Sequence, residues 1–408
     1  MRRRQLLALT PAAALAACTA EEPSQGPGAD GPGGSSDGSS DRGGAEGTSS
    51  QEPSAASSAP TTTEPPTAAE RLLETLSPRE LAGQLVLVGI PAGSEIPEQV
   101  LTEHHAGGIF LLQVWESAEA VDRTVARARE LSRSGLPALI AVDQEGGQVR
   151  MLRGDTARKT PSAETLGEQG TEAVTEAYTS IGEDLAARGI QVAFSPVADV
   201  VDPALGDANE PVGGLDRGFG TEPEAVGECV AAATTALAAQ GIGATLKHFP
   251  GLGRVQKNTD FSAEGIEDEV TGPEDPFLQS FRAGIEAGAQ LVMMSSAIYP
   301  QLEAGVPAMF SAAAIQDLLR DGLGFEGLVV TDDIGAAKAV AAVPVPERAT
   351  RLLEAGGDVV LTADASLTGE LVDAIEGWAA RSPEQEQRVR ESAGRMLALK
   401  EQLGLLQG

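Results

Sequence analysis

The stretch from Lys247 to Asp260 places a cation, an imidazole and a carboxylate on one glycine-bounded segment. It reads Lys247-His248-Phe249-Pro250-Gly251-Leu252-Gly253-Arg254 and runs on to Asn258-Thr259-Asp260. The short apolar run at 243–246 directly precedes it and is typical of a buried strand. We therefore expect Lys247 and His248 at the carboxyl end of that strand, and we expect the loop to bring Asp260 to the same mouth.

Polar side chains also follow other apolar runs of strand length. They are Asp143, Asp199, Ser296 and Asp332. A single Asp at such a place is commonly the N-cap of the next helix, and this is the alternative interpretation for Asp199 in particular. Polar residues at the ends of several wholly apolar strands are hard to explain as part of a hydrophobic core. Taken together, these residues favour a polar pocket.

The elements that must position these side chains form a repeating pattern. The apolar runs are 86–89, 108–112, 138–143, 192–196, 243–246, 291–295, 328–332 and 358–361. Amphipathic helical patterns lie between them at 118–133, 172–188, 224–240 and 273–286, and a final helix is expected at 382–402. Continuous apolar strands separated by helices predict parallel strands that are covered on both faces.

Eight such units predict an α/β fold, a single (β/α)8 TIM barrel over residues 69–408. Its active site would lie at the carboxyl ends of the strands, where the polar groups stand. An open doubly wound sheet is the alternative. No glycine-rich phosphate-binding fingerprint follows the first run, which counts against that alternative and against a nucleotide ligand.

The N-terminal residues predict export and not a folded domain. Arg2, Arg3 and Arg4 precede an apolar run that ends before Cys18, which is the pattern of a secretory signal and too short to cross a bilayer. The sequence Leu15-Ala16-Ala17-Cys18 matches the bacterial lipobox. We therefore expect residues 1–18 to be a lipoprotein signal peptide with lipidation at Cys18. An ordinary signal peptide is the alternative, and the arginines also weakly resemble a twin-arginine signal.

Residues 19–68 are rich in Gly, Ser, Pro, Thr and acidic residues and have almost no large apolar side chains. Such a segment buries too little surface to offset its chain entropy, so we expect a disordered tether. The N-terminal features together predict an exported protein at the outer face of the cell membrane, held there by its lipid alone.

Composition excludes several partners. A formal net charge of −31 repels nucleic acid and anionic lipid, so neither is expected to bind. Cys229 lies in an Ala-rich helical pattern and is expected to be a buried small apolar residue. No Cys/His cluster has metal-ligand spacing, so no metal and no cofactor is expected. The oligomeric state is left open by these patterns.

Paired carboxylates without a nucleophile elbow, metal cluster or phosphate loop favour glycoside hydrolysis. One carboxylate would attack or stabilise the anomeric carbon, and the other would handle the leaving-group proton. The remaining polar groups would bind sugar hydroxyls. Only 3% of the residues are aromatic, which favours a pocket for one terminal sugar over a cleft for a long polymer.

Four motifs, taken in order, resemble glycoside hydrolase family 3 and most of all its single-domain bacterial β-N-acetylglucosaminidases. They are Ala141-Val142-Asp143-Gln144-Glu145-Gly146-Gly147, Arg217-Gly218-Phe219-Gly220, Lys247-His248-Phe249-Pro250-Gly251 and Gly324-Phe325-Glu326-Gly327-Leu328-Val329-Val330-Thr331-Asp332-Asp333. The resemblance implies a TIM barrel and a retaining mechanism with Asp332 as nucleophile and Asp333 in a supporting role at most. It implies that the terminal sugar contacts Asp143, Arg217, Lys247 and His248.

The chain departs from the family pattern at the acid/base. The family has Lys-His-Phe-Pro-Gly-His-Gly followed after four residues by Asp-Ser-His, a pair carried on a mobile loop. Here Leu252 replaces the glycine-flanked His, and Asn258-Thr259-Asp260 replaces Asp-Ser-His. Asp260 is therefore the predicted acid/base, provided that loop closure or Asp332 raises its pKa.

Two further departures concern the sugar contacts. Ser296 stands where the family usually has a His, and Met151 stands where it has a sugar-binding Arg, which leaves Arg150 or Arg153 as substitutes.

The sequence thus predicts a retaining, exo-acting glycoside hydrolase that removes terminal β-linked N-acetylglucosamine from cell-wall peptidoglycan fragments. This sequence retains the family's nucleophile motif and its sugar-contacting residues, and this favours the function. A lipoprotein that binds sugar or muropeptide with weak or no turnover is the alternative, as is a β-glycosidase with another sugar specificity.

Overall fold

The computed structural model describes residues 65–406. The predicted signal peptide, Cys18 and nearly all of the predicted tether lie outside the described residues. Helix α1 (Ala68–Leu73) begins one residue before the boundary at 69 that composition suggested, because the Thr67 side chain and Glu70 form a reciprocal capping box there.

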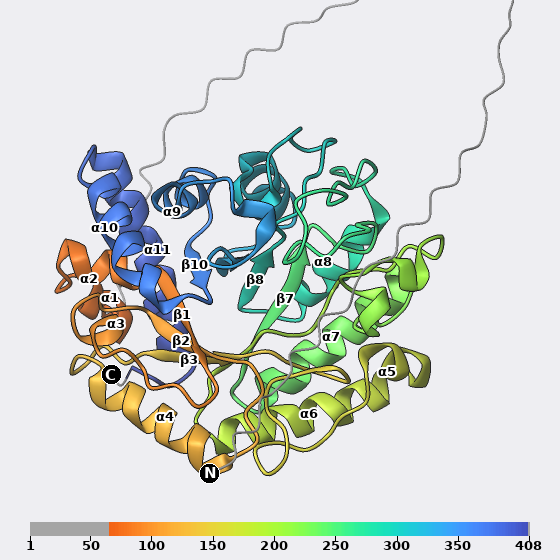
Figure 1. Cartoon of the computed structure of the whole chain (residues 1–408), viewed down its shortest axis with the longest axis horizontal. Coiled ribbons are helices and arrows are strands. Elements are labelled where there is room, and N and C mark those ends of the chain that lie inside the picture. The colour runs from red at the N-terminus through yellow and green to blue at the C-terminus, as the bar shows by residue number, and fades with distance from the viewer. Residues whose placement is uncertain (1–64, 407–408) are drawn as a thin grey trace, which may run out of the picture. The chain divides into compact units, whose positions relative to one another are not determined.

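The described residues form a closed barrel of parallel strands with helices on its outside (Figure 1). Around the barrel the order is β1-β10-β9-β8-β7-β6-β3-β2. The strands are β1 (Val86–Pro91), β2 (Gly108–Leu112), β3 (Leu139–Val142), β6 (Val192–Ala193), β7 (Gly243–Phe249), β8 (Leu291–Met294), β9 (Leu328–Asp333) and β10 (Val359–Thr362). Each apolar run in the sequence contributes one strand, so the predicted (β/α)8 barrel is confirmed and the open sheet is wrong.

The helices follow the amphipathic patterns, with one correction. They are α2 (Pro78–Gly83), α3 (Gln99–Thr102), α4 (Ala118–Leu131), α5 (Ala163–Gln169), α6 (Thr171–Ala187), α7 (Pro223–Ala239), α8 (Gln279–Glu286), α9 (Val345–Glu354), α10 (Thr368–Ala379) and α11 (Pro383–Gln402). The helix predicted to start at 273 starts instead at Gln279, after a short 3-10 turn. Pro273 and Pro276 prevent a continuous helix through that segment. Between β8 and β9 the chain forms a π-helix at Ala313–Gly322.

Apolar side chains close the amino-terminal end of the barrel. The inward-facing strand residues form one buried cluster that also includes Met396 and Leu399 of α11. Leu403, just after α11, lies beside Gly243 at the start of β7. Because apolar groups fill this end, the carboxyl ends of the strands are the place where the barrel can hold charged groups. No helix within residues 65–406 is long and apolar enough to span a bilayer.

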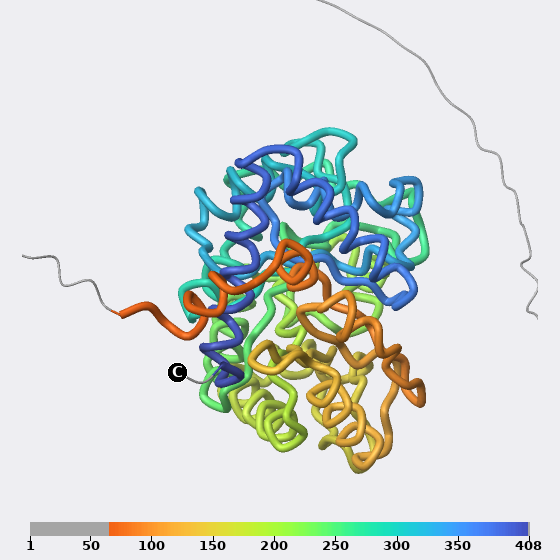
Figure 2. The backbone as a smooth tube through the Cα atoms, turned by 90° about the vertical axis from the view of Figure 1, so that its left-hand side faces the viewer, coloured from red at the N-terminus to blue at the C-terminus, as the bar shows by residue number. Residues whose placement is uncertain are grey.

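The first and last helices lie side by side on the outside of the barrel (Figure 2). The Glu401 carboxylate near the end of α11 accepts a hydrogen bond of 2.8 Å from the backbone N–H of Ala68 at the start of α1. This contact satisfies one of the free N–H groups at the amino end of α1 and fixes where the described domain begins.

Candidate active site

The barrel brings the predicted site residues together at the carboxyl ends of its strands. Asp143 directly follows β3, Lys247 and His248 lie in β7, and Asp332 lies in β9. Arg217 comes from the β6–α7 connection, and Asp260 comes from the long β7–α8 connection. Contacts join Lys247 to Asp143 and Arg217 to His248, and the charges of Asp332 and Arg217 act on Asp260.

A buried carboxylate, Glu145, holds the two cations of the site. It lies in β4 (Gln144–Gly146), which pairs with β5 (Val149–Arg150) just after Asp143. Its two oxygens accept from Arg217 Nε at 2.9 Å and from Arg217 Nη2 at 2.8 Å, and Lys247 Nζ lies 2.6 Å from Oε1. Burial alone would raise the pKa of Glu145, but the charges of Arg217 and Lys247 lower it to about 2.

Lys247 is also bound on its other side. Its Nζ donates to Asp143 Oδ1 at 2.6 Å, and the side chain is almost fully buried. Burial favours the neutral amine, but the carboxylates of Asp143 and Glu145 raise the pKa of Lys247 above its ordinary value. Lys247 is therefore a fixed ammonium, whereas Asp143 still has a partly exposed carboxylate.

The donors of both cations are nearly all in use. Arg217 gives Nε and Nη2 to Glu145, Nη2 also to His248, and Nη1 to the carbonyl of Pro211 at 2.7 Å. Counted against five N–H groups for arginine and three for lysine, one donor of each remains without a partner among the described residues. The family resemblance implies sugar contacts for Lys247 and Arg217, and the structure shows that most of their N–H donors bind other protein groups.

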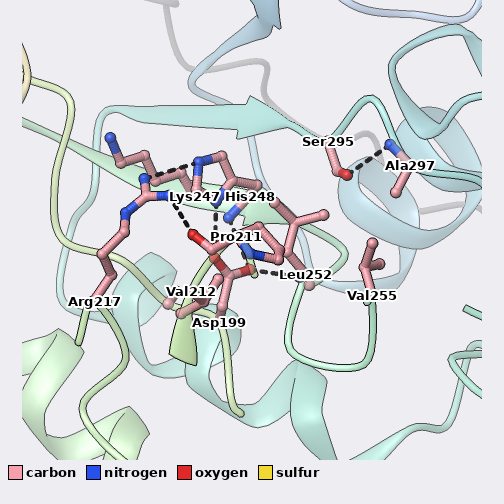
Figure 3. Close-up of polar contacts among 12 residues, drawn as sticks. Asp199, Pro211, Val212, Arg217, Lys247, His248, Leu252, Val255, Ser295 and Ala297 are labelled. Atoms are coloured by element: carbon pink, nitrogen blue, oxygen red, sulfur yellow. Dashed lines mark hydrogen bonds and ion pairs between the residues drawn. The ribbon is translucent and has the colours of Figure 1, made fainter. Parts of the chain in front are cut away.

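His248 is oriented by Asp199. Asp199 Oδ2 lies 2.8 Å from His248 Nδ1, and its Oδ1 accepts from the backbone N–H groups of His248 and Leu252 (Figure 3). Arg217 Nη2 lies 3.3 Å from His248 Nε2 and can only donate, so the ring proton belongs on Nδ1. Asp199 is therefore no helix cap, since α7 begins only at Pro223.

The carboxylates of Asp332 and Asp333 differ in the hydrogen bonds that they accept. Asp333 accepts from the backbone N–H groups of Gly335, Ala336 and Ala363 at 2.7–2.9 Å, so its carboxylate braces the turn after β9 and ties it to the residue that follows β10. Asp332 is half-buried and accepts only from the backbone N–H of Asp333. Within residues 65–406 no cation pairs with Asp332, which leaves its carboxylate available to a ligand.

The pKa of the Asp260 carboxyl is raised above its ordinary value. The protein atoms around its carboxyl raise the pKa to about 6, and the negative charge of Asp332 acts in the same direction. Solvent still reaches the residue, so its proton can exchange with water. Asn258 Oδ1 accepts from the backbone N–H of Asp260 at 2.9 Å, so Asn258 orders the turn and not the carboxyl of Asp260.

The loop that carries Asp260 is docked on the turn that follows β9. The carbonyls of Thr259 and Asp260 accept from the backbone N–H groups of Ala339 and Lys338, at 3.1 and 3.3 Å, and Thr259 is buried. Further along, Arg254 Nη1 donates to Asp275 Oδ2 at 2.9 Å and ties the start of the connection to its end.

The remaining sequence candidates take structural positions. Arg150 Nε donates to the carbonyl of Gly147, and Arg153 Nε donates to that of Arg150, so both guanidinium groups brace their own loop. The Ser296 hydroxyl is buried and has no partner among the described residues. Cys229 is buried in α7, which confirms its predicted apolar role.

Sequence reasoning missed the roles of Glu145 and Asp199. Glu145 stands two residues after Asp143 inside the first motif, and this spacing was the one signal that could have found it. In the described part of the chain, no group of three or more His, Cys, Asp or Glu is arranged to hold a metal ion.

The chain is similar to known proteins in sequence and in fold. The family model described as "Glycosyl hydrolase family 3 N terminal domain" matches residues 78–399. A beta-hexosaminidase of Xanthomonas axonopodis pv. citri is 36% identical over 306 residues, which make up 72% of this chain and 87% of that protein.

Solved structures agree as well. The crystal structure of a beta-N-acetylhexosaminidase from Beutenbergia cavernae has a TM-score of 0.76 and 39% identity, over 80% of this chain and 99% of that one. A family 3 beta-N-acetylglucosaminidase from Paenibacillus sp. has a TM-score of 0.73 and 30% identity, over 82% of this chain and 64% of that one.

The buried ion cluster predicts a large stability effect at Glu145. Glu145→Gln removes the charge that both cations face, so we expect the free energy of unfolding to fall by about 3 kcal/mol. Urea unfolding at pH 7 measures it. The matched control is Glu119→Gln, which breaks an exposed pair with Arg123 on α4 and should cost less than about 1 kcal/mol. Equal small losses in the two variants would contradict the role of Glu145.

Proposed function

The chain belongs to glycoside hydrolase family 3, and we propose that it is a retaining, exo-acting β-N-acetylglucosaminidase. Asp332 is its nucleophile, and Asp260 is its acid/base. The observation that carries this proposal is the pairing of an unengaged carboxylate, Asp332, with a second carboxyl whose pKa is raised to about 6. A retaining glycosidase needs one ionised and one protonated carboxyl at the scissile bond.

The electrostatic coupling of Asp260 to Asp332 suits a two-step reaction. While Asp332 is ionised, its charge keeps the proton on Asp260, which then donates that proton to the glycosidic oxygen as Asp332 attacks the anomeric carbon. The bond to the leaving group breaks, and Asp332 becomes a neutral ester. Loss of its charge lowers the pKa of Asp260, so Asp260 becomes the base that takes a proton from the attacking water.

The buried cluster supplies the contacts for one terminal sugar. Asp143 offers a partly exposed carboxylate, and Lys247 and Arg217 each keep one N–H for a hydroxyl. Charge-assisted bonds of this kind hold hydroxyls firmly.

N-acetylglucosamine is favoured as that sugar by the relatives. The similar proteins from Xanthomonas, Beutenbergia and Paenibacillus are named as beta-hexosaminidase, beta-N-acetylhexosaminidase and beta-N-acetylglucosaminidase. We propose peptidoglycan fragments as the natural source of the substrate, because the N-terminal residues predict a location next to the wall.

A sugar-binding protein with little turnover is the second candidate. It is favoured by one observation, the replacement of Asp-Ser-His by Asn258-Thr259-Asp260. A general acid contributes about 10²–10⁴-fold to the rate, so a poor acid would leave binding intact and turnover slow. Calorimetry with N-acetylglucosamine beside a turnover assay separates the two candidates, since binding without release supports the second.

We propose that the enzyme acts outside the cell as a lipoprotein. The support is the lipobox at Leu15-Ala16-Ala17-Cys18 and the spacer composition of residues 19–68. One acyl chain gives marginal membrane binding, whereas the multiple chains of a bacterial lipoprotein anchor stably.

Asp332→Ala should abolish release of the aryl group from an aryl N-acetyl-β-glucosaminide, because no nucleophile remains. Binding of N-acetylglucosamine, measured by calorimetry, should persist. Asp317→Ala, on the exposed side of the π-helix, is the control and should keep full activity. Equal rates for wild type and Asp332→Ala would remove Asp332 as nucleophile. A panel of aryl glucosides and xylosides in the same assay identifies the sugar.

The pH profile tests Asp260. For a disaccharide, whose leaving group needs a proton, we expect kcat/KM to fall as the pH rises through about 6, because Asp260 must be protonated to donate. Asp260→Asn should lower this rate about 10²–10⁴-fold and remove the pH dependence, while an activated dinitrophenyl glycoside loses far less. Glu264→Gln, an exposed carboxylate on the same loop, is the control. An unchanged disaccharide rate in Asp260→Asn would exclude Asp260 as the acid.

Lipidation is tested by detergent phase partition of the protein expressed in a bacterial host. The wild type should enter the detergent phase, and Cys18→Ser should stay in the aqueous phase because it has no acyl acceptor. Cys229→Ser keeps the lipobox and should partition as the wild type does. Aqueous partition of the wild type would contradict the lipoprotein proposal.

A further inference from the structure

Phe261 is an aromatic side chain at the surface of a chain that buries its aromatic residues. Its exposed fraction is 73%. The other aromatic side chains are buried, apart from Phe277, which is partly buried with the Arg254 guanidinium 3.7 Å from its ring centre. Single exposed apolar residues are common on protein surfaces, so exposure by itself assigns no role. The position of Phe261 supplies the second observation.

Phe261 directly follows Asp260 in an ordered turn. The carbonyl of Asn258 accepts from the backbone N–H groups of Phe261 and Ser262 at 3.1 and 3.0 Å. The two preceding carbonyls, of Thr259 and Asp260, are docked on the turn after β9. The backbone of Phe261 is therefore fixed relative to the strand that carries Asp332, directly after the residue that carries the acid.

The acid divides the site into two sides. A general acid acts at the glycosidic oxygen, so it lies between the terminal sugar and the leaving group. Asp332 and Arg217, which the proposed function places on the terminal-sugar side, both act electrostatically on Asp260. Phe261 is the next residue in the chain and is exposed to solvent, so it is available to a sugar on the other side of the acid.

We propose that Phe261 is the platform for the leaving-group sugar, and this rests on the proposed function. The ring would stack on the apolar C–H face of the residue that is β-linked to the terminal N-acetylglucosamine. A neutral flat ring suits this role, because a sugar ring has an apolar face and carries no charge there. As the one largely exposed aromatic among the described residues, Phe261 provides one stacking site, which fits recognition of a single leaving-group ring and not of a long polymer.

The test compares two substrates that differ only beyond the scissile bond. N-acetyl-β-glucosaminyl fluoride releases an ion that cannot stack, whereas the β-1,4-linked N-acetylglucosamine disaccharide releases a ring. Phe261→Ala should lower kcat/KM about tenfold for the disaccharide and less than twofold for the fluoride. Phe261→Trp should restore the disaccharide rate, and Phe261→Leu should restore only part of it because it is apolar but not flat.

Val270→Ala is the matched control, since Val270 is 62% exposed on the same connection and does not adjoin the acid. It should change neither rate. A misplaced acid would also spare the fluoride, so binding of the intact disaccharide is measured by calorimetry in the Asp332→Ala background. Binding unchanged by the added Phe261→Ala would overturn the platform and assign Phe261 to positioning the acid, and a proportional loss of both rates would overturn it too. Unchanged rates for both substrates would overturn it as well.

Failure of the proposed function gives a different result. If the wild type hydrolyses neither substrate, the enzyme assignment fails, and calorimetry then tests the platform. Phe261→Ala must weaken binding of the disaccharide about tenfold and leave binding of the N-acetylglucosamine monosaccharide unchanged. Equal effects on the two sugars would overturn the platform in that case too.

Discussion

The rest of the site depends on the bidentate ion pair between Glu145 and Arg217. Glu145 also forms an ion pair with Lys247. Burying these charges is costly, and a well-packed apolar cluster would often be as stable. What the cluster provides is neutralisation, because two cations face the carboxylates of Asp143 and Glu145. Neither cation then pairs with Asp332 or Asp260, so burial of the Asp260 carboxyl and the charge of Asp332 together raise the pKa of Asp260.

The barrel makes this concentration of charge possible by being apolar elsewhere. Its interior is filled by strand side chains, and Met396 and Leu399 of α11 join them. Parallel strands aim all their carboxyl ends at one mouth, so side chains more than a hundred positions apart in the chain, such as Asp143 and Lys247, come within 2.6 Å. The same geometry places Asp199 beneath His248 and fixes its ring proton.

The sequence predicted the strands well because continuous apolar runs leave few other structures for them. It also placed Asp143, Lys247, His248 and Asp332 at strand ends, where topology alone brings them together. It could not assign Glu145 or Asp199, because the role of a carboxylate depends on which donor reaches it across the barrel. The start of α8 was misplaced, since Asp275 and Pro276 form a 3-10 turn that apolar spacing does not reveal.

The turn after β9 joins the parts of the chemistry into one unit. It follows the strand that carries Asp332, Asp333 braces it through the backbone N–H groups of Gly335 and Ala336, and its own N–H groups donate to two carbonyls of the Asp260 loop. A carboxylic acid that has lost the His of the family pattern needs its proton held by its surroundings. Docking on this turn keeps Asp260 near the negative charge that holds the proton, and it keeps Phe261 beside the acid. In the proposed mechanism, movement of the loop away from the turn would remove the raised pKa and the platform together, so the same hydrogen bonds would couple proton donation to leaving-group recognition.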